Sequence, residues 1–290
     1  MSEALTAGAR TTRSDLFRAA HACLAEADAD TKVALTRQAA AAWRSRSLAS
    51  ASTGDASPSC DESCVDVPPG LPAAVRLVDP RTVPHRRLRS EKGRAAFVHA
   101  IAHIEFNAIN LAWDCVHRFR DLPEAYYDDW VRVAGEEAEH FDLLRKRLGE
   151  LGFAYGDFDA HDGLWEMAAR TADDLVARMA MVPRVLEARG LDVTPAMITR
   201  FEQADDEATA AILKIILEEE VGHVAVGSRW FRYACACREL EPVETFSQMV
   251  RTHLSGGPKP PFNIDARGLA GFEAAELEML EELGAGKAAG

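Results

Sequence analysis

The chain has 290 residues, of which 48% are hydrophobic, 27% are charged and only 7% are aromatic. This length and composition allow a full hydrophobic core, and long stretches rich in alanine, leucine and glutamate favour helices over strands. The 33 basic and 46 acidic side chains give a formal net charge of −13. Such a charge argues against broad binding to nucleic acid or to an anionic membrane.

Targeting signals are not apparent in the sequence. Residues 1–14 lack the apolar core of a signal peptide, and no apolar run reaches the roughly 18 residues of a membrane span. The six cysteines show neither a disulfide framework for a chain of this length nor the paired spacing of a zinc site. We therefore expect a protein of the reducing cytoplasm without a membrane-spanning segment.

The N-terminal part of the chain predicts a helical hairpin followed by a linker. Apolar residues recur at helical spacing over Arg13–Ala27 and again over Thr31–Arg46, with Asp30 as the expected cap between them. These two helices form an N-terminal extension over residues 1–48. Serine, proline and glycine become frequent after it, which predicts a linker over residues 49–88.

Residues 89–240 predict a bundle of four long helices. The third helix should kink at Pro183 and end at Gly190, and Thr194-Pro195 should open a short helix after it. Beyond Glu239 we expect an irregular C-terminal wrap over residues 241–290, with one short helix within Ala266–Leu283. The four long helices are expected over Glu91–Phe119, Pro123–Leu151, Leu164–Arg189 and from Asp205 or Asp206 to Cys237.

Two near-equal repeats carry the residues suited to chemistry. In each repeat a glutamate precedes a Glu-x-x-His motif, by 32 residues in the first repeat and by 33 in the second. Residues three apart lie on nearly one face of a helix, so the glutamate and histidine of each motif can reach the same metal ion. One glutamate from each of two helices and Glu-x-x-His from each of the other two is the ligand set of di-iron carboxylate bundles. The candidate metal ligands are therefore Glu105, Glu137, His140, Glu187, Glu220 and His223.

Surface charge is the alternative explanation for these motifs, since a single Glu-x-x-His is common in a glutamate-rich helix. Apolar neighbours surround Glu105 and Glu220, however, and a buried carboxylate that lacks a partner is costly. We therefore predict a site for two metal ions. Carboxylate and imidazole ligands suit iron, with manganese or zinc as alternatives.

Several residues near the motifs allow two interpretations. Arg184 either anchors an anionic substrate or forms a salt bridge, and we favour the salt bridge. Three polar residues of the first bundle helix either orient the histidines or make ordinary structural hydrogen bonds: Asn107, Asn110 and Asp114. Four further glutamates are expected to face mostly solvent: Glu136, Glu139, Glu218 and Glu219.

Four segments of the chain resemble a known family. They read H-x-E-F-N-A-I-N-L-A-W-D, E-E-A-E-H, L-E-A-R-G-L-D and E-E-E-V-G-H-V-A-V-G. The chain is similar to the ferritin-like proteins grouped as domain of unknown function family 455, over Ala19–Phe272 and including the connector R-x-V-P-x-R-x-L. The resemblance implies a ferritin-like four-helix bundle with a di-metal centre, and this chain matches all six ligand positions. More distantly, the pattern is similar to the di-iron hydroxylase that acts on a hypermodified adenosine in tRNA.

These observations lead to one expected function and two alternatives. We expect a di-iron carboxylate oxidoreductase that activates O2 to hydroxylate or oxidise an organic substrate, which is either a small molecule or a modified nucleotide. The alternatives are a ferritin-like protein of iron oxidation or storage and a non-catalytic helical interaction protein, so whether the chain is an enzyme stays open. No Gly-rich dinucleotide motif follows a strand, so an external electron donor is expected. The oligomeric state is left open.

Overall fold

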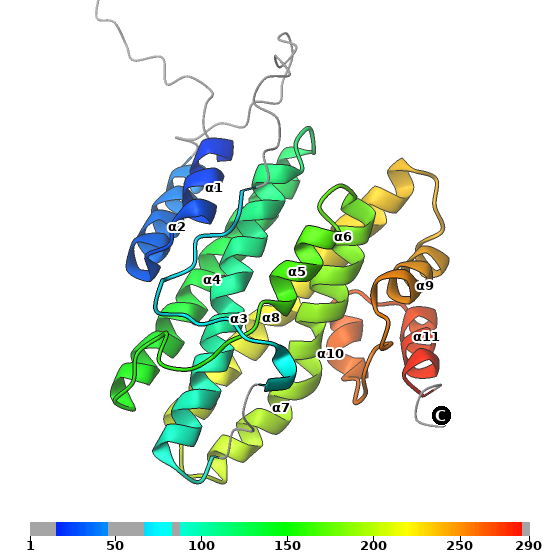
Figure 1. Cartoon of the computed structure of the whole chain (residues 1–290). Coiled ribbons are helices and arrows are strands. Elements are labelled where there is room, and N and C mark those ends of the chain that lie inside the picture. Colours follow the sequence, from blue (N-terminus) through cyan, green and yellow to red (C-terminus); the bar gives the residue numbers. More distant parts are fainter. Residues whose placement is uncertain (1–15, 46–66, 83–87, 286–290) are drawn as a thin grey trace, which may run out of the picture.

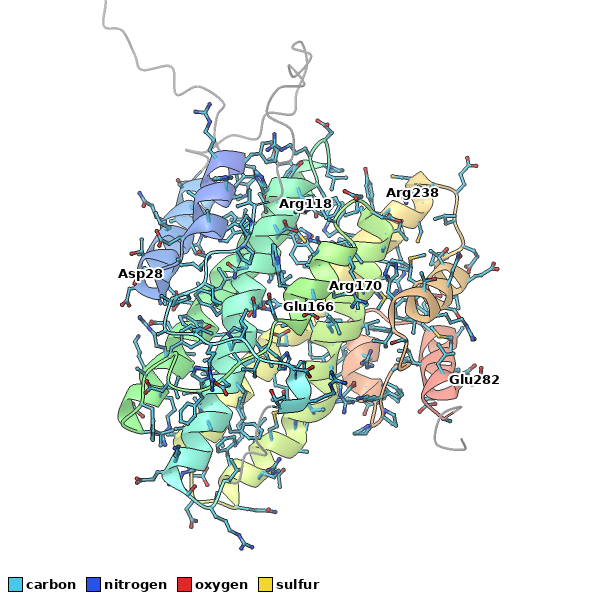
Figure 2. All side chains as sticks on the ribbon, viewed as in Figure 1. Asp28, Arg118, Glu166, Arg170, Arg238 and Glu282 are labelled. Carbon is cyan, nitrogen blue, oxygen red and sulfur yellow. The ribbon has the colours of Figure 1, made fainter. Side chains whose placement is uncertain are left out.

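The computed structural model describes residues 16–45, 67–82 and 88–285. Every regular element in these ranges is helical, apart from an isolated bridge between Leu77 and Ala160 (Figure 1). The prediction of an all-helical protein is confirmed. No helix of the described ranges is long and apolar enough to cross a membrane. Charged side chains such as Arg170 and Arg238 lie on the outer surface (Figure 2).

Four long helical columns, called here the helical core, form the centre of the molecule. In chain order they are α3 (Glu91–Arg118), α4 (Glu124–Glu150), the run of α6 (Leu175–Met181), η2 (Val182–Glu187) and α7 (Ala188–Glu202), and α8 (Glu207–Cys237). Figure 1 shows these columns side by side. α4 packs on both α3 and α8, and the third column packs on α8.

Local sequence signals explain where these helices begin. Ser90 caps α3 by accepting a hydrogen bond from the backbone N–H of Gly93, and Asp206 caps α8 in the same way through Thr209. Pro123 directly precedes α4, where its missing N–H removes no helical hydrogen bond. The sequence-predicted beginnings of these three helices are therefore correct to within one residue or two.

The third column differs from the prediction. Leu164–Arg189 was expected as one helix, but α5 (Gly163–Arg170) is separate, and Asp174 starts α6 by capping Val176. The predicted end at Gly190 is also wrong, because α7 continues through Gly190 and Pro195 to Glu202. A glycine ends a helix when its φ is positive, and Gly190 keeps the helical φ instead.

The disturbance expected at Pro183 takes the form of a π-helical segment, η2. Proline cannot donate the hydrogen bond that an α-helix needs, so the backbone widens there. Gly227 of α8 lies against it, since a methyl group on Gly227 would come within 2.3 Å of the Pro183 Cβ. This close approach seats η2 on α8.

The N-terminal hairpin consists of α1 (Leu16–Ala25) and α2 (Ala29–Arg44), which pack on α3 and α4 respectively. The cap of α2 is Asp28 and not Asp30, since its carboxylate accepts from the N–H of Thr31 at 2.9 Å. Lys32 of α2 is fully buried and donates to the backbone oxygens of Cys23 and Leu24 at the end of α1. These hydrogen bonds satisfy carbonyls that the end of a helix leaves without partners.

Much of the predicted linker, residues 49–66 and 83–87, lies outside the described residues. The part that is described runs along the hairpin and the helical core. Its Gly70 N–H donates to the oxygen of Leu24 at 2.8 Å, and it ends in the short 3-10 helix η1 (Pro80–Thr82). The domain boundaries at residues 48, 88 and 240 stay a prediction.

The expectation of an irregular C-terminal wrap was wrong. This part contains α9 (Pro242–His253), α10 (Ile264–Leu269) and α11 (Ala274–Ala285). The sequence signal was Glu241 followed by Pro242, because Glu241 accepts from Glu244 N–H and proline suits a first helical turn. Phe246 and Val250 of α9 are then buried against the rest of the protein.

Arg184 of η2 holds the C-terminal helices to the helical core. Its guanidinium lies 2.7 Å from the Glu276 carboxylate of α11, and both side chains are about 1% exposed. Three phenylalanine rings surround the guanidinium at 4.2–4.7 Å from their centroids, which favours cation–π attraction. The salt bridge favoured from the sequence is confirmed.

Candidate metal centre

The two Glu-x-x-His motifs meet where α4 and α8 pack together. Glu137 and His140 project from α4, and Glu220 and His223 project from α8. Each of the four side chains offers one ligand atom, and these atoms all lie within 4.8 Å of one another. Such a group could hold a metal ion.

Glu137 lies between the two imidazoles. Its Oε1 is 2.9 Å from Nδ1 of His223, and its Oε2 is 3.4 Å from Nδ1 of His140. The ring centroids of the two histidines are 5.6 Å apart. Both rings therefore present Nδ1 to the interior of the cluster, where a single carboxylate reaches both.

The two single glutamates approach the cluster from the other two columns. Glu105 of α3 places Oε2 at 3.3 Å from Nδ1 of His140. Glu187 is the last residue of η2, and burial together with the carboxylates of Glu220 and Glu137 raises its pKa. All six sequence-predicted residues therefore lie in one buried region of the helical core, while their individual roles as ligands stay a prediction.

The π-helical segment accounts for the position of Glu187. A π-helical turn holds more residues than an α-helical one, so it rotates the side chains that follow it. Glu187 is the last residue of this segment, and the segment packs on α8. The π-helical segment that Pro183 causes thus positions the carboxylate of Glu187.

Electrostatic interactions in the cluster are strong. Burial, reinforced by neighbouring carboxylates, raises the pKa of Glu187 to about 8 and that of Glu105 well above its usual range. Burial opposes the ionisation of Glu137 as well, yet the imidazoles of His223 and His140 lower its pKa. Burial disfavours a charged His140, but hydrogen bonds with Glu105 and Glu137 raise its pKa to about 11. Burial therefore disfavours ionised carboxylates at this site, and a neighbouring positive charge offsets that cost.

A pair of divalent cations fits this donor set. Oε2 of Glu187 and Oε2 of Glu220 are buried without a hydrogen-bond partner among the described residues. Unpaired buried carboxylate oxygens are costly, and metal coordination is one of the few ways to satisfy them. Four carboxylates would balance the charge of two divalent ions, and the mixture with imidazole suits iron, manganese or zinc.

The outer nitrogens of both histidines are held by glutamates of the opposite helix. Nε2 of His223 donates to Glu136 of α4 at 2.8 Å, and Nε2 of His140 donates to Glu219 of α8 at 2.7 Å. Such bonds fix the tautomer that leaves Nδ1 free to bind a metal. Glu219 is exposed as expected and Glu136 is half-buried, and the sequence did not predict their contacts across the helices.

The sequence contains a signal for this crossed arrangement. A second glutamate directly precedes the motif glutamate in both repeats, so each reads Glu-Glu-x-x-His. The remaining two neighbours, Glu139 and Glu218, are exposed as expected. This repeated pair of glutamates could have predicted the crossed contacts.

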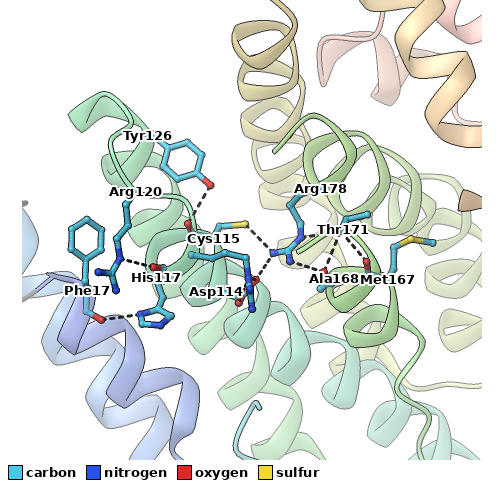
Figure 3. Close-up of polar contacts among 11 residues, drawn as sticks. Phe17, Asp114, Cys115, His117, Arg120, Tyr126, Met167, Ala168, Thr171 and Arg178 are labelled. Carbon is cyan, nitrogen blue, oxygen red and sulfur yellow. Dashed lines mark hydrogen bonds and ion pairs between the residues drawn. The ribbon is translucent and has the colours of Figure 1, made fainter. Parts of the chain in front are cut away.

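The three polar residues of α3 make structural hydrogen bonds. Asn107 contacts His103 at 3.1 Å, and Asn110 accepts from Lys32 at 2.6 Å. Asp114 pairs with the buried Arg178 of α6, as Figure 3 shows. These contacts support the structural interpretation of Asn107, Asn110 and Asp114 and not the orientation of the metal-site histidines.

Comparison with known proteins defines the family. Residues 25–278 match the family model described as "Protein of unknown function (DUF455)". The chain belongs to this family. A curated protein of Haemophilus influenzae (strain Rd), described as "Uncharacterized protein", is 47% identical over 220 residues, which cover 73% of this chain and 76% of that protein. No solved structure gave a significant match.

A cavity adjoins the cluster in this DUF455 protein. It has a volume of about 340 Å³ and lies between α3, α7 and α8, with the beginning of α5 beside it. Three of the six candidate ligands form part of its wall, namely Glu105, Glu187 and Glu220. A molecule in the cavity would therefore contact three of the candidate ligands.

Proposed function

We propose that this protein is a di-iron carboxylate oxidoreductase built on a ferritin-like bundle. The observation that carries the proposal is the adjacency of a buried Glu/His cluster and a cavity that three of its carboxylates line. Storage of iron needs no organic cavity at the metal centre, whereas oxidation of an organic molecule does.

The candidate ligands, the two outer glutamates and the helical core would each have a separate role. Glu105, Glu187 and the two Glu-x-x-His motifs would hold two ferrous ions, which would supply the activation of O2. Glu136 and Glu219 keep each imidazole in the tautomer that presents Nδ1. The helical core around the cluster excludes bulk water, which strengthens electrostatic interactions inside it.

The chemistry also requires a reductant. Hydroxylation of a C–H bond consumes one O2, two electrons and two protons, and it yields one alcohol and one water. The electrons would come from an external donor, as expected from the sequence. Manganese or zinc in the same ligands would instead point to a different reaction.

Anaerobic titration of the metal-free protein with ferrous iron tests the proposal. We expect saturation near two ions per chain, unchanged by repeated cycles of iron and air. Glu137→Ala should abolish binding of at least one ion with the helical content retained, while Glu139→Ala, at an exposed site two residues away, should bind as the original chain does. Iron uptake that rises with every cycle would indicate storage, and no uptake would contradict the proposal.

A further inference from the structure

We propose that the cavity beside the cluster binds an uncharged, mainly aliphatic molecule. This inference rests on the proposed function for its reaction, but the binding itself depends only on the cavity wall. It favours a small molecule over the modified nucleotide, the two substrate classes that the sequence left open.

The cavity wall is largely apolar. Its volume of about 340 Å³ is in the range of small-molecule sites, which are typically apolar with a few polar groups at one place. Three of its polar side chains are carboxylates of the cluster, and the others belong to Arg189, Thr194 and the exposed His161. Aliphatic side chains cover most of the remaining wall: Ile101, Ile104, Leu164, Val193, Leu213 and Ile216.

Among the described residues of this wall, Arg189 is the only arginine or lysine, and it is already engaged. Arg189 donates to the backbone oxygens of Lys259 and Pro261 at 2.7 and 2.8 Å, which attaches the C-terminal segment to α7. Its guanidinium also lies 3.5 Å from the carboxylate of Asp192. An anionic ligand would have to break these bonds before it could pair with the guanidinium of Arg189.

The cavity offers few of the groups that bind a nucleotide. Proteins bind unpaired bases by stacking them on aromatic rings, and they bind phosphate through arginine, lysine or helix N-termini. The wall contains no phenylalanine, tyrosine or tryptophan among the described residues, and Arg189 is occupied. The imidazole of the exposed His161 and the first turn of the short helix α5 are the remaining partners at its edge. Desolvation of a base and a phosphate would thus find little compensation in this cavity.

The position of the polar end sets the orientation of the ligand. Ile104 is 46% exposed and marks the side of the cavity that opens to solvent. Glu105, the next residue of α3, is buried at the cluster. An aliphatic molecule would therefore enter past Ile104 and bring one C–H end to the metal centre.

Gly190 offers a way to fill the cavity without disturbing the fold. It lies in α7 and lines the cavity, and a Cβ added there would meet no atom within 4 Å. Gly190→Leu should therefore occupy the cavity and favour the helix. Gly149 of α4 is equally open but lies outside the cavity wall, so Gly149→Leu is the matched control. Val193→Phe fills the cavity from one turn further along α7.

Binding of three probes to the metal-free protein tests the inference, measured by saturation-transfer NMR and titration calorimetry. We expect 1-decanol to bind, and decanoate and adenosine monophosphate to bind at least tenfold more weakly. Both Gly190→Leu and Val193→Phe should weaken decanol binding at least tenfold, whereas Gly149→Leu should not. Thermal melts would verify that the variants are folded.

Each outcome has a separate meaning. Binding of adenosine monophosphate or decanoate as tight as that of decanol, or decanol binding that neither cavity variant weakens, would overturn the inference. Uptake of two iron ions without decanol binding would overturn it and leave the proposed function standing. Decanol binding without iron uptake would support the cavity assignment and contradict the proposed function.

Discussion

Nε2 of His223 on α8 donates to Glu136 on α4 at 2.8 Å, and the inverse contact joins His140 of α4 to Glu219 of α8 at 2.7 Å. Each helix thus orients the imidazole of the other. The arrangement predicts that two glutamates outside the six candidate ligands contribute to metal binding, although both are partly open to solvent.

Removing either glutamate should weaken metal binding. Glu136→Ala leaves the outer nitrogen of His223 without its acceptor, and Glu219→Ala does the same to His140. Loss of such a partner typically costs about 10- to 100-fold in metal affinity. Competition with a chelator would measure the change for ferrous iron or zinc.

Glu139→Ala is the matched control for these variants. Glu139 lies between the two motif residues of α4, but it is exposed and pairs with Arg37 at 2.6 Å. Its removal should leave the metal affinity within about twofold of the original, because surface ion pairs contribute little. Equal losses in all three variants would contradict a specific role for the crossed pair.

Glu187→Gln should stabilise the metal-free protein and weaken its metal site. Burial beside Glu220 and Glu137 raises the pKa of Glu187 to about 8, so an ionised Glu187 is unfavourable in the fold. The free energy of unfolding at pH 7 should rise by roughly 1–3 kcal/mol without metal. Urea denaturation of metal-free protein would measure it.

The exposed Glu218 supplies the comparison, since Glu218→Gln should change that free energy by less than about 0.5 kcal/mol. With iron added, the Glu187→Gln protein should instead have a lower free energy of unfolding than the original chain, because the substitution removes a candidate ligand. If the metal-free Glu187→Gln protein were less stable than the original chain, the carboxylate of Glu187 would not destabilise the fold.

Gly227→Ala should destabilise the packing of α8 on η2. The added methyl group would lie 2.3 Å from the Pro183 Cβ, so the two segments must separate. Such overpacking costs about 1–3 kcal/mol, and it should also weaken iron binding by displacing Glu187. Gly222→Ala in the same helix meets no atom within 4 Å and should instead add roughly 0.5–1 kcal/mol of stability. Equal stabilities of the two variants would refute the close approach.

The buried Lys32 predicts a pH dependence in the alkaline range. Burial lowers its pKa from 10.5 to about 7, while it still donates to the Asn110 side chain at 2.6 Å. Between these values the unfolded chain retains a proton that the folded chain releases, so stability rises with pH. The contribution is at most about 1.4 kcal/mol per pH unit.

Urea denaturation at several pH values from 7 to 10 would isolate this effect. Lys32→Met removes the titrating group, so the difference in free energy of unfolding between the original chain and this variant should grow with pH. Below pH 7 the difference should become constant, because both states of Lys32 are then protonated. Parallel curves across the alkaline range would mean that Lys32 keeps its usual pKa.

The sequence alone determined the helical class and the six candidate residues. Glu-x-x-His places both side chains on one helix face through backbone geometry alone, so Glu137 with His140 and Glu220 with His223 were readable without a structure. The apolar residues around Glu105 likewise predicted that its carboxylate is buried. These signals are local, and they survive whatever the helices pack against.

Only the tertiary structure decided how these residues are supported. The bond from His223 to Glu136 depends on the crossing of α8 and α4, which helical periodicity does not specify. Gly190 and Pro195 carry strong local signals for helix ends, yet packing of α7 on α8 keeps both in the helix. Local propensities amount to about 1 kcal/mol for glycine and about 3 kcal/mol for proline, and burial of an apolar helix face outweighs them.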